Sequence, residues 1–172
     1  MTTTSPNAEQ FSGLILLTGE DKPGLAHSLF EALSPFSVAV VDIDQIIIKQ
    51  RLILTVEISL NPAHQVAIEE DLSSLAETLN VDIAAVFSMS MIANQWPEQF
   101  ALTMKSTKVH PKHLSVVTKS LLSAGANIED IQRSALNPVE ITVTVSGISE
   151  AQLSHVINSV DSGNEFSLTI GA

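Results

Sequence analysis

An internal repeat constrains the fold of this 172-residue chain more than any other feature. Three pairs of like residues recur 88 positions apart: Pro23 with Pro111, Leu33 with Leu121, and Asp42 with Asp130. Repetition at a constant spacing indicates two copies of one structural unit. The spacing falls to 81 between Leu72 and Leu153, so we expect a shorter loop before the last helix of the second copy.

Hydrophobic periodicity predicts the element order strand, helix, strand, strand, helix, strand in each copy. In the first copy we expect strands at 14–17, 38–49, 51–60 and 81–88, and helices from Pro23 and from about His64. The second copy repeats this order from Phe100 to Ile170. Two such copies are two ferredoxin-like sandwiches in tandem, with helices on one face of an antiparallel sheet, and the fold class is α+β.

The same pattern sets the expected domain boundaries. Met1–Gln10 is polar and is predicted to be a disordered tail, followed by a first domain at 11–88. Met89–Glu98 is predicted to be a linker, and the second domain covers 99–172. The chain stops directly after its last predicted strand, which suggests either a piece of a longer protein or a regulatory chain.

Charge and composition exclude several classes of partner. The net charge is −11, from 19 acidic and 8 basic residues, and lysine and arginine never cluster beyond two neighbours. We therefore expect no binding to nucleic acid or to an anionic membrane. Cysteine is absent, which excludes disulfides and thiolate chemistry. No apolar run is long enough to span a bilayer, and we expect a soluble, cytoplasmic protein.

One face of the first predicted sheet lacks an obvious cover. If side chains alternate strictly, Ile15, Leu17, Ile46, Ile48 and Ile53 point away from the helices. Either this face packs on another sheet or domain, or the register is wrong by one residue. We favour self-association.

The turn after the first strand is the main candidate binding site. Pro23 suits a first helical position, Asp21 is placed to cap the helix, and Gly24 allows a ligand to approach the backbone. A helix start supplies N–H donors, which suit a small anion such as an amino-acid carboxylate. The alternative is a turn that only connects its neighbours.

The turn sequence Asp-Lys-Pro-Gly within this element order resembles the ACT domain, a sensor of small molecules. Three stretches carry the resemblance: 18–30, 41–54 and 125–131. The last two are more narrowly similar to the tandem ACT region of actinobacterial-type phosphoserine phosphatases, over residues 11–172. The resemblance implies binding of an amino acid, with L-serine expected, and a homodimer formed through ACT pairing. In that family a magnesium-dependent phosphatase domain follows, which converts O-phosphoserine to serine and phosphate. The present chain lacks that domain, so we expect no cofactor or metal here.

The resemblance also implies which residues contact the amino acid. The turn supplies Asp21, Pro23, Gly24 and Leu25, and the facing strand of the other copy supplies Asn127 and Ile128. The Asn127 amide can both donate and accept hydrogen bonds, although Asn127 could equally only begin a strand. Lys112 stands where the first copy has Gly24, and Ala39 where the second has Asn127. A complete site is therefore expected only between the first turn and the second domain.

Three motifs that imitate catalytic or ligand-binding sites are incomplete in this sequence. Asp42-Ile43-Asp44 imitates a phosphatase nucleophile motif, but the strand continues past it and Ile46 replaces the usual Thr or Val. Gly19–Gly24 lacks the Lys-Ser/Thr of a phosphate-binding loop. His110 and His113 have no third metal ligand fixed by spacing. We predict no catalytic residue in this chain.

Two other functions stay open. The chain also resembles free-standing tandem-ACT accessory proteins of the glycine-cleavage repressor type, which act through a protein partner. A third possibility is a dimerisation domain that has lost its ligand. The copies pair either within one chain or between chains, and the ligand either inhibits or activates.

Overall fold

The computed structural model describes residues 9–91, 97–160, 163 and 165–171. The chain forms two compact units, residues 1–94 and 95–172. Of the predicted linker, 92–96 lie outside the described residues, while Met89–Met91 belong to the last strand of the first unit. Of the predicted tail, 1–8 lie outside the description, and Glu9 already begins the first strand.

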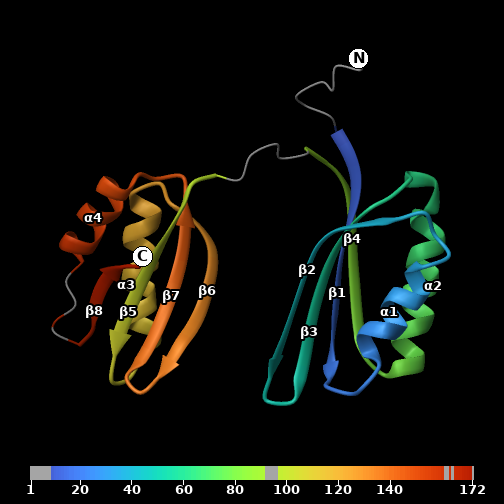
Figure 1. The fold of residues 1–172 in the computed structure, drawn as a ribbon, viewed down its shortest axis with the longest axis horizontal. Coiled ribbons are helices and arrows are strands. Elements are labelled where there is room, and N and C mark those ends of the chain that lie inside the picture. Colours follow the sequence, from blue (N-terminus) through green and yellow to red (C-terminus); the bar gives the residue numbers. More distant parts are fainter. Residues whose placement is uncertain (1–8, 92–96, 161–162, 164, 172) are drawn as a thin grey trace. The chain divides into compact units, whose positions relative to one another are not determined.

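The first unit is a four-stranded antiparallel sheet with two helices on one face (Figure 1). Its elements are β1 (Glu9–Glu20), α1 (Leu25–Leu33), β2 (Ala39–Ile48), β3 (Arg51–Ser59), η1 (Pro62–His64), α2 (Gln65–Leu79) and β4 (Asp82–Met91). The strand order is β2-β3-β1-β4, so β2 and β4 form the edges of this sheet.

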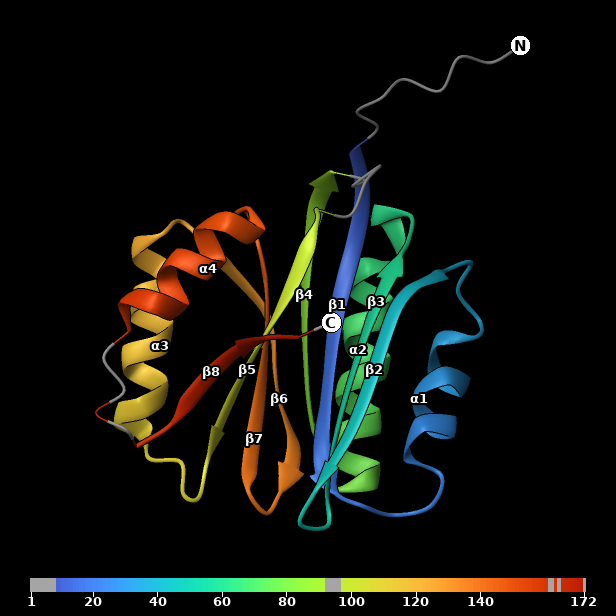
Figure 2. The same cartoon turned by 60° about the vertical axis from the view of Figure 1, so that its left-hand side comes forward.

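The second unit repeats the architecture, as Figure 2 shows from another side. Its elements are β5 (Gln99–Ser106), α3 (Pro111–Ser123), β6 (Asn127–Leu136), β7 (Val139–Ser146), α4 (Glu150–Ser159) and β8 (Ser167–Ile170). The strand order is β6-β7-β5-β8. The predicted α+β class and the tandem βαββαβ order are confirmed.

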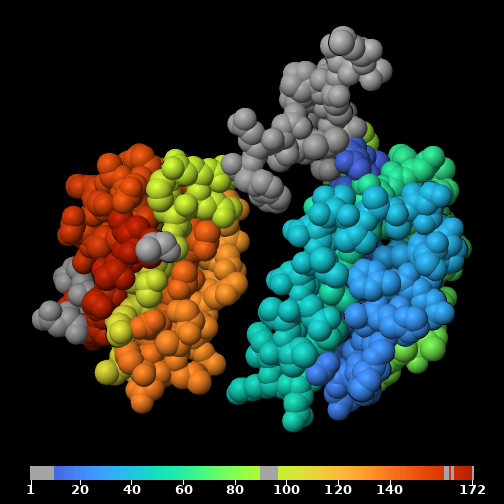
Figure 3. Space-filling view, in the orientation of Figure 1, coloured from blue at the N-terminus to red at the C-terminus, as the bar shows by residue number. Residues whose placement is uncertain are grey.

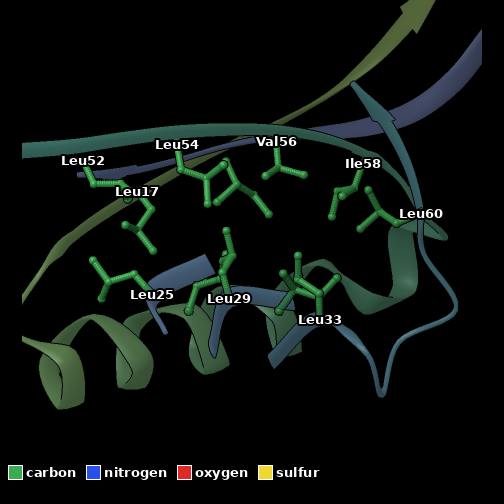
Figure 4. Close-up of a cluster of buried hydrophobic side chains, with 12 residues drawn as sticks. Leu17, Leu25, Leu29, Leu33, Leu52, Leu54, Val56, Ile58 and Leu60 are labelled. Atoms are coloured by element: carbon green, nitrogen blue, oxygen red, sulfur yellow. The ribbon is translucent and has the colours of Figure 1, made fainter. Parts of the chain in front are cut away.

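The core of the first unit lies between the sheet and its helices (Figure 4). Alternate residues of β3 are buried, and α1 presents leucines spaced four residues apart toward them. The buried residues labelled in Figure 4 are Leu17, Leu25, Leu29, Leu33, Leu52, Leu54, Val56, Ile58 and Leu60. This packing fixes the end of β1 and the start of α1, and therefore the turn between them.

The predicted register of β1 is wrong by one residue. Ile15 and Leu17 are fully buried in the core, whereas Leu14 and Leu16 are 53% and 37% exposed on the other face. The reason is strand pairing, because Ile15 lies opposite Val56 and shares its side of the sheet.

The uncovered face nevertheless exists. Leu14 and Leu16 are joined there by Val86 of β4, which is 67% exposed. Ile46 and Ile48 of β2 are also exposed on this face, as predicted.

Within the described residues, no helix is both long and apolar enough to cross a membrane.

Candidate functional site

The turn between β1 and α1 differs from its prediction in where the helix begins. Helix α1 starts at Leu25, and Gly24 is its N-cap residue with φ 96° and ψ −8°. Pro23 is therefore not the first helical residue, and Asp21 does not cap the helix. The left-handed backbone of Gly24 excludes it and the residues before it from the helix, which explains the error.

The start of α1 leaves backbone donors uncovered. No side chain among the described residues caps it, and its first turn contains no acidic residue. The first helical hydrogen bond runs from the Ser28 N–H to the Gly24 carbonyl, at 2.9 Å. The N–H groups of residues 25–27 come before this bond, so the helix itself offers them no acceptor. Leu25 is 4% exposed, backbone included, so it anchors the helix to the core.

One end of the turn is fixed by the neighbouring hairpin. The Asp21 N–H donates to the Gln50 carbonyl at 2.7 Å, which ties the turn to the β2–β3 connection. Pro23 and Gly24 are exposed, and apart from Gly24 and its two chain neighbours no atom lies within 4 Å of the position that a Gly24 Cβ would take. The turn is thus anchored to the sheet and open above Gly24.

A cavity of about 510 Å³ opens beside the turn. Lys22 and Arg51 line it together with three carboxylates, Glu20, Glu77 and Asp82. Lys22 pairs with Glu20 at 3.1 Å, and both side chains are more than half exposed. Asp21, Pro23 and Gly24 do not line this cavity, so it is separate from the predicted contact residues.

The predicted contact residues of the second unit lie at the start of β6. Asn127 is its first residue, and its Nδ2 donates to Glu129 Oε1 at 2.8 Å. The Ser146 hydroxyl donates to the same oxygen. Hydrogen bonds from Ser146, and secondly from Asn127, lower the pKa of the Glu129 carboxyl below its ordinary value of 4.5. Ile128 is half-buried against the second core.

Glu129 was missed in the sequence analysis. The pairing of β6 with β7 shifts between Ile128 and Asp130, a bulge that leaves Glu129 unpaired. The carboxylate then reaches Ser146 on the neighbouring strand. No local spacing in the sequence signals such a bulge.

The turn before α3 corresponds to the Gly24 turn but is built differently. His110 is the N-cap residue of α3, and the His110 N–H donates to His113 Nδ1 at 3.3 Å. The Glu165 carboxylate contacts Lys112 Nζ at 2.7 Å and His113 Nε2 at 2.6 Å. Hydrogen bonds from Lys112, then from His113, hold the pKa of Glu165 below its ordinary value.

The other motifs singled out in the sequence do not form a catalytic or metal site among the described residues. Asp42 and Asp44 lie within β2 with exposed side chains, not at a strand end. Among the described residues, no group of three or more His, Cys, Asp or Glu could hold a metal ion. The turn residues and Asn127 belong to different units, so their predicted meeting stays a prediction.

Comparison with known proteins identifies the fold and its relatives. Residues 13–86 match the ACT domain family. The chain is 29% identical over 143 residues to the phosphoserine phosphatase of Streptomyces coelicolor, and 28% identical over 139 residues to phosphoserine phosphatase SerB2 of Mycobacterium tuberculosis. Each match covers 78% of this chain but only 33% and 34% of the relative. The chain thus spans about a third of the length of these relatives.

Solved structures match over nearly the whole chain. A protein assigned as a glycine cleavage system transcriptional repressor has a TM-score of 0.76 at 12% identity, over 94% of this chain and 96% of that one. An unknown protein from Galdieria sulphuraria has a TM-score of 0.67 at 17% identity, over 95% and 98%. At these identities the likeness shows the fold alone, which is a tandem ACT fold.

Proposed function

We propose that this chain functions in amino-acid sensing. It is built of two ACT-type units and is homologous to the N-terminal third of phosphoserine phosphatases. The expected ligand is L-serine, and the chain acts as the regulatory and oligomerisation region of such a phosphatase. A ligand that binds one arrangement of the units more tightly than another shifts the population toward it, and so changes the activity of an attached domain.

The open turn at Gly24 is the observation that carries this proposal. The uncapped N–H donors at the start of α1 suit the α-carboxylate of an amino acid, since hydrogen bonds to a charged acceptor contribute about 1.5–3 kcal/mol each. The proposed contacts are Asp21, Pro23, Gly24 and Leu25 from the turn, with Asn127 and Ile128 from the facing strand. We add Glu129, because its lowered pKa keeps a carboxylate beside Asn127 for the ligand's ammonium group.

Edge strands provide a way to bring the two sets together. All ten residues of β2 are exposed, and β2 and β6 are each an edge of their sheet. An edge strand offers unpaired backbone groups to another strand. Antiparallel pairing of β2 with β6, in the same chain or a second one, puts the start of β6 beside the end of β2. That end leads to Gln50, whose carbonyl accepts from Asp21 in the turn.

Calorimetry with L-serine, and with glycine as a smaller analogue, tests the proposal directly. We expect saturable binding of serine in the millimolar range or below. Absence of any heat from both amino acids at millimolar concentration would contradict amino-acid sensing.

Two substitutions of Gly24 separate blocked binding from damaged folding. Gly24→Val puts a branched side chain over the turn at a φ that strains it, while Gly24→Asn has a similar volume and tolerates the left-handed region. We expect both variants to lose about tenfold or more in affinity, and Gly24→Asn to keep the wild-type circular dichroism. Unchanged affinity in Gly24→Asn would remove the turn from the site.

A further inference from the structure

We infer that Lys112 and His113 form a carboxylate-binding site in the second unit, and that Glu165 of the same chain is its built-in ligand. The turn before α3 is then closed to an external amino acid, while the turn before α1 stays open. This inference deepens the proposed function and rests on it only for the expected ligand count.

The geometry is that of a bound carboxylate. Glu165 Oε1 accepts from Lys112 Nζ at 2.9 Å, and Oε2 lies 2.7 Å from the same nitrogen. Oε2 also lies 2.6 Å from His113 Nε2. Lys112 stands 88 residues after Gly24, so this carboxylate contacts the residue that replaces the open glycine of the first turn.

The histidine is held in place for this contact. Its side chain is 4% exposed, and its ring centre lies 5.3 Å from that of His110 and 5.2 Å from that of Phe166. Because Nδ1 accepts the His110 N–H, a neutral ring carries its proton on Nε2, which then donates to Glu165. An exposed Lys–Glu pair alone contributes little to stability, so the buried imidazole distinguishes this site from a surface ion pair.

The backbone of Glu165, which carries this carboxylate, is also held in place. The Ser106 hydroxyl donates to the Glu165 carbonyl at 2.7 Å, and the next residue, Phe166, is 7% exposed in the second core. In Figure 2, β8 begins near the N-terminal end of α3. The Ser106 hydrogen bond and the buried Phe166 therefore hold the Glu165 backbone in place, as in a preorganised ligand.

Removing the side chain of Glu165 should leave a vacant carboxylate site. We expect sodium formate to raise the melting temperature of Glu165→Ala more than sodium chloride does at equal ionic strength, because a ligand that binds only the folded state stabilises it. Glu165→Gln is the matched control, since its amide keeps the volume and leaves no vacancy. The double variant Lys112→Met, Glu165→Ala lacks half of the site.

The results expected are a formate-dependent rise of a few degrees in Glu165→Ala, and no such rise in the wild type, in Glu165→Gln or in the double variant. Equal responses of all four proteins would overturn the inference. If Glu165→Ala is unfolded in chloride, recovery of its circular dichroism with increasing formate supports the inference, and failure to recover overturns it. None of these readouts involves serine.

Ligand stoichiometry gives a second measurement, which does depend on the proposed function. We expect calorimetry to give one serine per wild-type chain. Two serines per chain would show that the second turn is open and would overturn the inference, although amino-acid sensing itself would stand. If the wild type does not bind serine but Glu165→Ala responds to formate, amino-acid sensing is contradicted and the inference about Glu165 stands.

Discussion

Ile43 tests whether β2 is an association surface. It lies near the middle of β2, opposite Val56, and is 50% exposed although Val56 is fully buried. Figure 3 shows the β2–β3 hairpin at the surface of the first unit. A central position is covered by a partner strand in any register, so Ile43→Lys should disturb every form of edge pairing.

The exposed fraction sets the expected size of the effect. Full burial of an isoleucine contributes about 1.5–3 kcal/mol, so the half that remains exposed here contributes about 1 kcal/mol when a partner covers it. A twofold pair of chains loses this twice, and each lysine adds a desolvation penalty. The dimer should therefore weaken by about 2 kcal/mol or more, which is roughly a thirtyfold rise in the dissociation constant.

Sedimentation equilibrium over a dilution series measures that constant. Val66→Lys is the matched control, because Val66 is 64% exposed on α2 and belongs to neither edge strand. If β2 pairs within its own chain, the loss should appear instead as a urea midpoint lower than that of Val66→Lys. A variant that matches Val66→Lys in both measurements would refute edge pairing.

Three further predictions concern the stability of each unit, measured by urea denaturation. Leu29→Ala should cost about 2–5 kcal/mol, because Leu29 is fully buried in the first core. Gly19→Ala should cost about 1–3 kcal/mol, because the new Cβ would lie 2.6 Å from Val81 Cγ1 and 3.1 Å from Val81 Cβ, which forces Val81 to shift. Glu129 has a folded pKa below 4.5, so its hydrogen bonds with Ser146 stabilise the fold at neutral pH and are lost as pH falls through that lower pKa. Glu129→Gln should therefore lose less stability than the wild type between about pH 6 and pH 3.5.

The parts of the fold that could be predicted were those with an unambiguous period. In β3 polar and apolar residues alternate, and the predicted buried face is the observed one. In β1 the run Leu14–Leu17 is apolar on both faces, and periodicity cannot assign a side to such a run. Pairing with β3 decides it, which explains the error of one residue.

In the candidate site, too, local features could be predicted from the sequence and long-range contacts could not. A turn at Asp21–Gly24 was predictable from local chemistry, but its helix boundary was not, because proline and glycine each suit several turn positions. Glu129 depends on a bulge, and Glu165 meets His113 across 52 positions of sequence. Contacts of that range are set by how strands and helices pack, and neither residue stands in a recognisable motif.

The two copies of the repeat have diverged in complementary ways. The uncovered sheet face of the first unit presents Leu14, Leu16 and Val86, whereas in the second unit Thr103 lies opposite Thr142, and Lys105 pairs with Glu140 at 2.7 Å. A surface of threonines and an ion pair is compatible with water. Covering exposed leucine and valine with a partner lowers the free energy. If both proposals hold, the first unit has the open turn and the face that a partner covers, whereas the second unit occupies its own turn and has a polar face. Association and ligand binding should for that reason respond to substitutions in the first unit more strongly than to equivalent ones in the second.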